Sequence, residues 1–442
     1  MTPLDWFKKE RPLIGLLGSG GGLAQGAALA DPVTVRYVLV GGGGAGGGGQ
    51  GGGGGGGAGV RTATLEVAGG TAHPYQVGDG GRGYHPSYAP TTPQGGQGQN
   101  GTTSWFTDPT ITAGGGGGGG WQQVGPPGTA DHGADGSPFG GGGGGGGQDG
   151  PWETVSPYGS GGATHPEVNS NASYNGGNGY GGPGGGGGNR GGGGGGAGQH
   201  AQDADHSGPS AGGPTQNTGA AMVGGNGGLG YQVPTTYIPD DARNAMIPAS
   251  TANSADQLFV YYPGVAYDVP TPANFLGFPV PNVPGSQLRY FGGGGGGGAE
   301  TTRGGFGSGA PTFPSTGNYG GGGPAAGGGT NDPSAGANGV PGINARGGGG
   351  GGAGPGGNIA PGKNPASTPG SWPNSGHPGG SGVLIVQYPD AYTLTRSQPT
   401  YTSDISGPGP EGYKYFVAMG PAGASKGYNW PHPGTGTVQW DA

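Results

Sequence analysis

Glycine tracts constrain this chain more than any other feature. In the first tract, 41–59, all but three residues are glycine. Glycine has no side chain to bury and loses more backbone entropy on folding than any other residue. Such tracts are therefore either flexible spacers or segments packed so closely that only glycine fits. Further tracts lie at 114–120, 140–147, 184–198, 292–298, 320–329 and 347–357.

The composition helps to choose between these alternatives. With 129 Gly and 44 Pro among 442 residues, the chain has the bias of low-complexity, disordered proteins. However, only 9% of its residues are charged, and it carries 20 Tyr, 7 Trp and 10 Phe. A spacer needs neither low charge nor so much aromatic surface. We therefore expect an ordered chain, with the flexible spacer as the alternative.

A fold that uses glycine as its building material follows from polyproline II geometry. That helix repeats every three residues, rises about 3.1 Å per residue and makes no internal hydrogen bonds. Without side chains, several such helices can approach closely and bond to one another. The predicted fold is mostly irregular and β: a bundle of polyglycine II helices, sandwiched by short β-strands and aromatic-rich loops, with a short N-terminal helix.

Several segments have the residue pattern of strands. Residues 33–40 (VTVRYVLV), 60–70 and 383–388 (VLIVQY) are rich in β-branched and apolar residues. We expect 33–40 to be the strand that holds the start of the glycine bundle, and 383–388 to be the strand that holds its end. Residues 412–420 (GYKYFVAMG) are strand-like, and Leu258–Tyr262 is expected to form a strand or a packing ridge. Residues 425–442 are expected to hold rings and turns.

The N-terminal residues 2–11 have the signals of a short helix, with Thr2 as cap and Pro3 in the first turn. A secretory signal is not expected, because glycines 18–22 interrupt the apolar stretch. No run reaches the roughly 20 apolar residues of a membrane span, so membrane insertion is not expected either. The residues expected to anchor this segment to a partner are Trp6, Phe7, Leu13, Ile14, Leu16 and Leu17.

These features divide the chain into three regions. Residues 1–32 form an anchoring segment, and 33–389 form the glycine-rich polyglycine II and β domain with long loop inserts. Residues 390–442 change in composition and form a small C-terminal strand and turn module, or a strap over the main domain.

The sequence argues against catalysis and nucleic-acid binding. It has no Cys, no Gly-x-Ser-x-Gly elbow and no phosphate-binding Gly-Lys-Ser/Thr, so we expect neither an enzyme nor a cofactor. The net charge of −8 and the absence of a basic stripe disfavour nucleic acid. One polar cluster could bind a divalent ion in a tight loop, although a solvated turn is the favoured interpretation. Its members are His200, Asp203, Asp205 and His206.

Three sequence motifs carry a resemblance to a known family. They are YVLV running into polyglycine, YQVGDGGRG at 75–83, and GGSGVLIVQYP at 379–389. Together they resemble the glycine-rich domain of bacteriophage tail-fibre and adhesin proteins, over about residues 33–389. The opening FKKERPLIGLLGSGGG is similar to N-terminal segments of virion fibre proteins of marine and cyanobacterial phages.

The resemblance implies a virion protein of the tail or fibre, attached to other virion proteins through its N-terminus. Its loops would contact a host surface glycan or outer-membrane protein, and a homotrimer is among the expected assemblies. Alternatives are a decoration or connector fibre that binds no receptor and, less favoured, a secreted glycine-rich matrix protein.

Aromatic residues among amides and hydroxyls are the candidates for receptor contact, because rings stack on sugars and apolar patches while short polar groups adapt. For any one of these rings, packing over the glycine bundle is the alternative. The candidates are Tyr84, His85, Tyr88, Trp105, Phe106, Tyr158, Tyr174 and Tyr180.

Overall fold

The computed structural model gives the architecture of a large part of the chain. The residues it describes are 30–48, 52–83, 96–121, 133–137, 142–143, 155–156, 179–180, 191–197, 225, 227–238, 290–298, 342, 346–352, 376–397, 403–404, 407–408, 412–419 and 434–442. Within these ranges the chain forms strands and irregular segments and no α-helix, which confirms the expected mostly irregular and β fold. The N-terminal helix expected at 2–11 and the strand or ridge expected at Leu258–Tyr262 lie outside the described residues.

The first sheet contains the strands that flank the glycine tracts. Its order is β12-β14-β10-β1-β2, with β13 also paired to β14, and all pairs are antiparallel. Its strands are β1 (Ala30–Val40), β2 (Val60–Gly69), β10 (Val383–Pro389), β12 (Ser403–Asp404), β13 (Gly407–Pro408) and β14 (Tyr413–Met419). β1 pairs directly with β10, from Arg36 opposite Gln387 to Val40 opposite Val383. The two strands expected to open and close the glycine region are therefore neighbours in one sheet.

A second antiparallel sheet packs against the first. Its order is β11-β15-β3-β4-β5. Its strands are β3 (His73–Val77), β4 (Ser104–Phe106), β5 (Asp108–Ala113), β11 (Thr393–Ser397) and β15 (Gly434–Asp441). Two small pairs complete the described strands: β6 (Val155–Ser156) with β7 (Gly179–Tyr180), and β8 (Tyr231–Gln232) with β9 (Tyr290–Phe291).

The C-terminal region is part of both sheets. β14 pairs with β10 along its whole length, and β15 lies between β11 and β3. The expected boundary at 389/390 therefore does not separate the described strands into two bodies. Residues 434–441, expected as rings and turns, form β15 because its Val438 and Trp440 alternate into the core.

Aromatic rings fill the space between the two sheets. Tyr37 and Phe106 meet edge to face with centroids 5.5 Å apart, and Trp440 lies 6.5 Å from Phe106. All these rings are almost completely buried. The first sheet is apolar on its other face as well, where Ile385 and Val417 pack in a second cluster with Phe291. The first sheet is thus the middle layer, which explains why every residue of β10 from Val383 to Tyr388 is buried.

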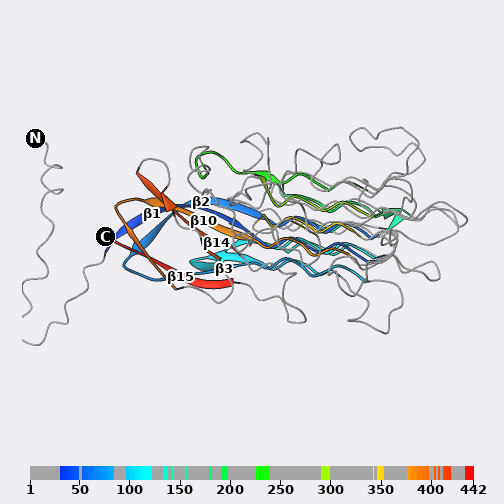
Figure 1. Cartoon of the computed structure of the whole chain (residues 1–442), viewed down its shortest axis with the longest axis horizontal. Helices are drawn as coiled ribbons and strands as arrows, with labels where there is room; N and C mark the ends of the chain where they lie inside the picture. The colour runs from blue at the N-terminus through cyan, green and yellow to red at the C-terminus, as the bar shows by residue number, and fades with distance from the viewer. Residues whose placement is uncertain are drawn as a thin grey trace, which may run out of the picture.

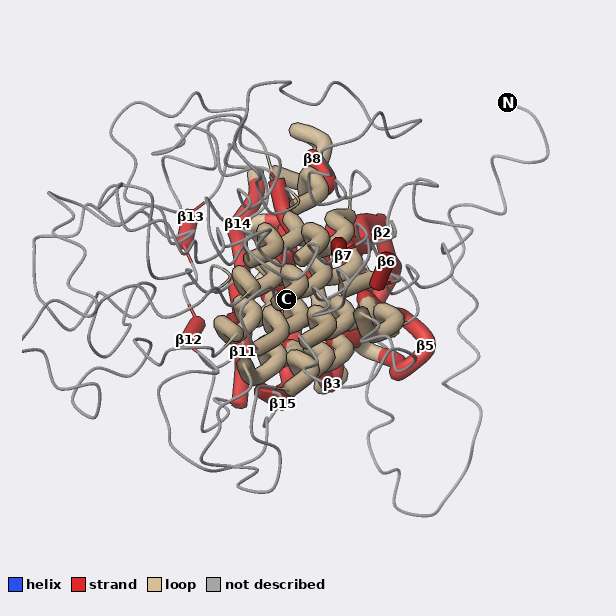
Figure 2. The backbone as a smooth tube through the Cα atoms, turned by 90° about the vertical axis from the view of Figure 1, so that its right-hand side faces the viewer, coloured by secondary structure: helices blue, strands red, loops and turns tan. Residues whose placement is uncertain are grey.

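Glycine segments continue directly from the strands. β1, β3, β5 and β9 run into segments 41–48, 78–83, 114–120 and 292–298, while segments 52–59, 96–103 and 376–382 lead back into β2, β4 and β10. The strands gather at one end of the molecule, and the glycine segments extend side by side from them (Figure 1). Seen along their length, the segments form a packed bundle in front of the strands (Figure 2).

Segment 41–48 shows how the bundle is held together, because its N–H groups change partner with a period of three residues. Every third N–H group donates to the same neighbouring segment. Gly41, Gly44 and Gly47 donate to Gly59, Gly56 and Gly53; Gly42, Ala45 and Gly48 to Thr102, Gln99 and Gly96; Gly43 and Gly46 to Gly380 and His377. The donor–acceptor distances in these eight bonds run from 2.8 to 3.1 Å.

The carbonyl groups of the same segment accept from three other segments. Gly116 donates to Gly42, Gly81 to Gly43, and Gly350 to Gly44. Segment 41–48 therefore exchanges main-chain hydrogen bonds with six neighbours, three through its donors and three through its acceptors. This is the arrangement of a rod at the centre of a hexagonal bundle.

Close approach of the main chains makes glycine obligatory at these contacts. A Cβ atom added to Gly44 would overlap the carbonyl oxygen of Gly117, and one on Gly47 would overlap that of Gly120. Ala45, between them, is fully buried and accommodated. Asn100 joins two further segments, since its amide accepts from the Gly118 N–H at 2.8 Å and donates to the Asp135 carbonyl at 3.0 Å.

Adjacent substitutions in segment 41–48 test this packing. Gly44→Ala should lower the free energy of unfolding by about 3 kcal/mol or more, because the obstructing atom is main chain and cannot rotate away. Ala45→Gly, the matched control, should cost only about 1 kcal/mol. Denaturant unfolding of both variants measures the difference. Equal effects would contradict close main-chain packing at Gly44.

Candidate functional site

The two ends of the molecule differ in what the chain does there. At the strand end, Ala30 pairs with Gly69, and the Gly70 N–H donates to the Trp440 carbonyl at 2.8 Å. The first described residue and the C-terminus therefore both lie at this end (Figure 1). At the opposite end, which we call the distal end, the glycine segments stop.

Main-chain contacts bring many segment ends together at the distal end. The Gly48 N–H donates to Gly96, and the Gly53 N–H donates to Gly120. The Gly298 N–H donates to Gly52. Consequently residues 48, 52, 83 and 96, which flank two stretches outside the described residues, lie at the distal end.

Most predicted contact residues belong to parts of the chain outside the described residues. Tyr84, His85 and Tyr88 follow Gly83, and so are joined to the distal end of segment 78–83. Tyr158 and Tyr174 also lie outside, and Tyr180 is described only as main chain of β7. The metal candidates and the anchoring residues are likewise not described: His200, Asp203, Asp205, His206, Trp6, Phe7, Leu13, Ile14, Leu16 and Leu17. Within the described ranges, no cluster of metal-ligating side chains was found.

Phe106 requires a correction. It was expected as a receptor contact, but its side chain is fully buried between the sheets, against Tyr37 and Trp440. Strand alternation explains the outcome, since Ser104 and Phe106 point into the core and Trp105 points to the outer face. Of this pair of neighbouring rings, only Trp105, which is partly exposed, can contact a ligand.

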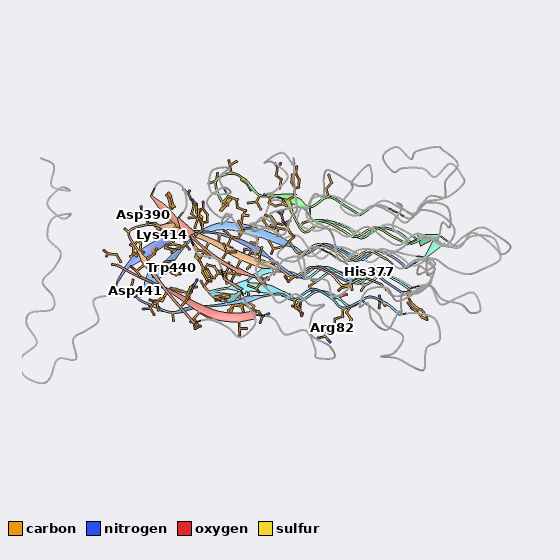
Figure 3. The ribbon with its side chains drawn as sticks, viewed as in Figure 1. Arg82, His377, Asp390, Lys414, Trp440 and Asp441 are labelled. Atoms are coloured by element: carbon orange, nitrogen blue, oxygen red, sulfur yellow. The ribbon has the colours of Figure 1, made fainter. Side chains whose placement is uncertain are left out.

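Buried ionisable groups inside the bundle are the features that motif reading missed. Asp79, 3% exposed, is the second residue of the segment after β3, and its Oδ1 atom has no hydrogen-bond partner among the described residues. Burial raises the pKa of Asp79 to about 7, against the opposing effects of the Gly80 N–H and the Arg82 charge. His377, 7% exposed, lies within segment 376–382, and burial lowers its pKa to about 4. Arg82 and His377 both lie beyond the strands, among the glycine segments (Figure 3).

Arg346 is a third buried ionisable residue, at the start of segment 346–352. Its Nη1 donates to the Tyr290 carbonyl at 2.6 Å, and its guanidinium lies 5.0 Å from the centroid of the Phe291 ring. These contacts join the segment to β9. In the sequence, Asp79, His377 and Arg346 could have been noticed as ionisable residues that stand next to glycines.

Comparison with known proteins supports the glycine-rich assignment. Residues 18–235 match the family model of a glycine-rich domain. This part of the chain is therefore similar to a glycine-rich domain. Hydrogen bonds from Gly295 to Gly55 and from Gly350 to Gly44 show that segments beyond residue 235 belong to the same bundle. Searches of curated proteins and of solved structures found no match.

No helix among the described residues is long and apolar enough to cross a membrane.

The buried ionisable groups predict two opposite pH effects on the stability of the glycine-rich domain. Because the pKa of Asp79 is higher in the folded protein than its ordinary value of 3.8, its contribution to stability is lost as pH rises toward 7. Asp79→Asn should therefore gain free energy of unfolding relative to wild type between pH 4 and 7, on the order of 4 kcal/mol. Denaturant unfolding across this pH range measures the gain. Glu66→Gln, at an exposed position of β2, controls for the loss of one carboxylate.

His377 should act in the other direction. Its folded pKa of about 4 lies below the ordinary 6.5, so its contribution is lost as pH falls through this interval. His377→Asn should gain stability relative to wild type toward pH 4, in the same unfolding series. A wild-type-minus-variant difference independent of pH, for either residue, would contradict burial of the titrating group.

Proposed function

We propose that this protein is a bacteriophage virion fibre or tail-tip adhesin whose glycine segments are polyglycine II helices. In this proposal the strand end faces the particle, and chain segments at the distal end contact the host surface. The protein carries out no catalysis.

The polyglycine II assignment is supported by the three-residue hydrogen-bond period of segment 41–48. A helix with three residues per turn presents every third N–H on the same side, so three successive residues address three different neighbours. The six-neighbour environment of this segment is what such helices require in a bundle. At about 3.1 Å per residue, an eight-residue segment would extend roughly 22 Å from the sheets.

The observation that supports the functional proposal is the separation between residues 30 and 442 at one end of the bundle and residues 48, 52, 83 and 96 at the other. A particle-bound adhesin needs this separation, with attachment at one end and variable chain at the other. Binding residues are commonly carried by loops on a rigid scaffold.

The class of partner follows from the distal chain. Residues 84–95 (YHPSYAPTTPQG) combine rings with hydroxyl and amide groups and have no Lys, Arg, Asp or Glu. Such composition suits a host surface glycan or an outer-membrane protein. The phage context itself rests on the sequence resemblance of the strand and polyglycine motifs to tail-fibre and adhesin proteins.

Blocking each end in turn tests the proposal. A fluorescent protein inserted between residues 89 and 90 should abolish binding of the purified full-length chain to a panel of bacterial strains. The same fluorescent protein fused after Ala442, at the strand end, should leave that binding intact. Flow cytometry of labelled cells measures both, and circular dichroism checks that both fusions fold.

Virion attachment needs a separate measurement. Immunogold electron microscopy of phage particles should place the protein at the tail or fibre, and removal of residues 1–29 should abolish its incorporation. Virion labelling without cell binding would instead support a decoration or connector fibre. Absence from particles, together with accumulation in cell-surface material, would overturn the virion proposal.

A further inference from the structure

Trp105 is an unusual residue on the outer face of the second sheet. Its neighbours Ser104 and Phe106 point inward, the Ser104 hydroxyl to the Val40 carbonyl and the Phe106 ring into the core. Trp105 takes no part in either apolar core and remains partly exposed. A large ring on the solvent side of a three-residue strand contributes little to the interior and is accessible to a ligand.

The register of the second sheet surrounds Trp105 with uncharged hydrogen-bonding groups. Gln76 on β3 lies opposite it on one side, and Thr112 on β5 lies opposite it on the other. Thr435 on β15 pairs in turn with Gln76. Because all four side chains point away from the core, they form a continuous outer row: Thr435, Gln76, Trp105 and Thr112.

Gln76 is held in a defined orientation within this row. Its Nε2 donates to the Thr103 carbonyl at 2.9 Å. This bond uses one of the two amide N–H donors and fixes the amide, and the amide oxygen remains as an acceptor. The row therefore offers a flat ring flanked by one acceptor and two hydroxyl groups.

The turn after Trp105 is strained, which supports a role for its geometry. Thr107 has a φ of 60°, although it is β-branched and such residues rarely adopt positive φ. The strained residue lies next to an irregularity in the β4–β5 register, between Trp105 and Phe106. Irregularities of this kind change the direction in which side chains point. The Thr107 N–H donates to the Pro74 carbonyl at 2.8 Å, and the Thr110 N–H donates to Asp108 Oδ1 at 2.7 Å. Retained backbone strain of this kind clusters at functional sites.

We propose that the row Thr435–Gln76–Trp105–Thr112 is a binding face for a neutral glycan. The apolar C–H face of a sugar ring stacks on the indole of Trp105, and the sugar hydroxyls bond to Gln76, Thr112 and Thr435. The absence of charge in the row selects neutral sugars, since an acidic sugar gains no cationic partner there and leaves its own charge partly desolvated. The row crosses four strands, so it suits an extended chain of sugars.

This glycan face lies on the flank of the sandwich and is distinct from the distal chain segments. It does not depend on the virion assignment, because it would bind glycan in a protein of any location. A glycan bound by Trp105 when the distal fusion has abolished cell binding would separate the two sites.

The test uses the full-length chain and defined oligosaccharides. Cellohexaose, maltohexaose, mannohexaose and chitohexaose are titrated into ¹⁵N-labelled protein while the indole N–H signals of its seven tryptophans are followed. A Trp105→Phe variant identifies the Trp105 signal by its disappearance. We expect at least one of these neutral sugars to shift the Trp105 signal in a saturable manner.

Variants then assign the contacts. Trp105→Ala should weaken affinity about tenfold, Trp105→Phe should keep part of it, and the isosteric Thr112→Val should weaken it several-fold. Tyr413→Ala, which removes a partly exposed ring from the first sheet, is the matched control and should leave affinity unchanged. Thermal melting checks that each variant is folded.

Several results would overturn the proposal. One is the absence of a shift at Trp105 with all four neutral hexasaccharides. Unchanged affinity in folded Trp105→Ala is a second. Tighter binding of an acidic oligomer, tested as alginate hexasaccharide, would exclude the neutral class.

Discussion

The absence of a Cβ atom at the contacts between glycine segments is the constraint on which this structure depends. At Gly44 and Gly47 a methyl group would occupy the position of a neighbouring carbonyl oxygen. Only with the side chain removed can the main chains come close enough for their N–H and C=O groups to pair between segments. The glycine tracts are thus a way of satisfying main-chain groups without a helix or a sheet. They also account for how a chain with so little apolar side-chain volume can still be packed.

The energetics of this arrangement explain why strands accompany the glycine segments. Ordering one residue costs about 1–2 kcal/mol of backbone entropy, and more for glycine. One main-chain hydrogen bond returns only about 0.5–1.5 kcal/mol net. The two terms roughly cancel, so the bundle needs a further source of stability. The aromatic core around Tyr37, Phe106 and Trp440 supplies this stability through apolar burial. β1 and β10, which contribute to this core, are continuous with segments 41–48 and 376–382 and so hold the ends of these segments in place.

Most of the strands could be predicted from the sequence, but the pairing of the strands could not. Strands at 33–40, 60–70, 383–388 and 413–419 could be predicted because β-branched and apolar residues concentrate there. β15 could not, since its Gly434 and Gly436 and its polar outer residues hide a two-residue alternation that only Val438 and Trp440 complete. The pairing of β1 with β10 joins residues more than 340 positions apart, which no local pattern encodes. The register of the three-residue hydrogen-bond pattern was equally invisible, because within a glycine tract every register reads the same.

The identical residues of the glycine tracts also make the candidate sites difficult to recognise in the sequence. In a tract of identical residues the register must be set by what interrupts or bounds it, and here these are the strands and a few polar residues. Asn100 joins two segments through its amide, and Arg346 fixes the start of another against Tyr290 and Phe291. The sequence analysis gave these residues no role and looked for function in the aromatic inserts. Alternate residues of a strand face opposite sides of the sheet, and this separates two of those rings. Phe106 packs in the core, while Trp105, one residue earlier, remains available for recognition. A ring in a glycine-rich chain can therefore be assigned a role only once the strand that carries it, and the face it occupies, are known.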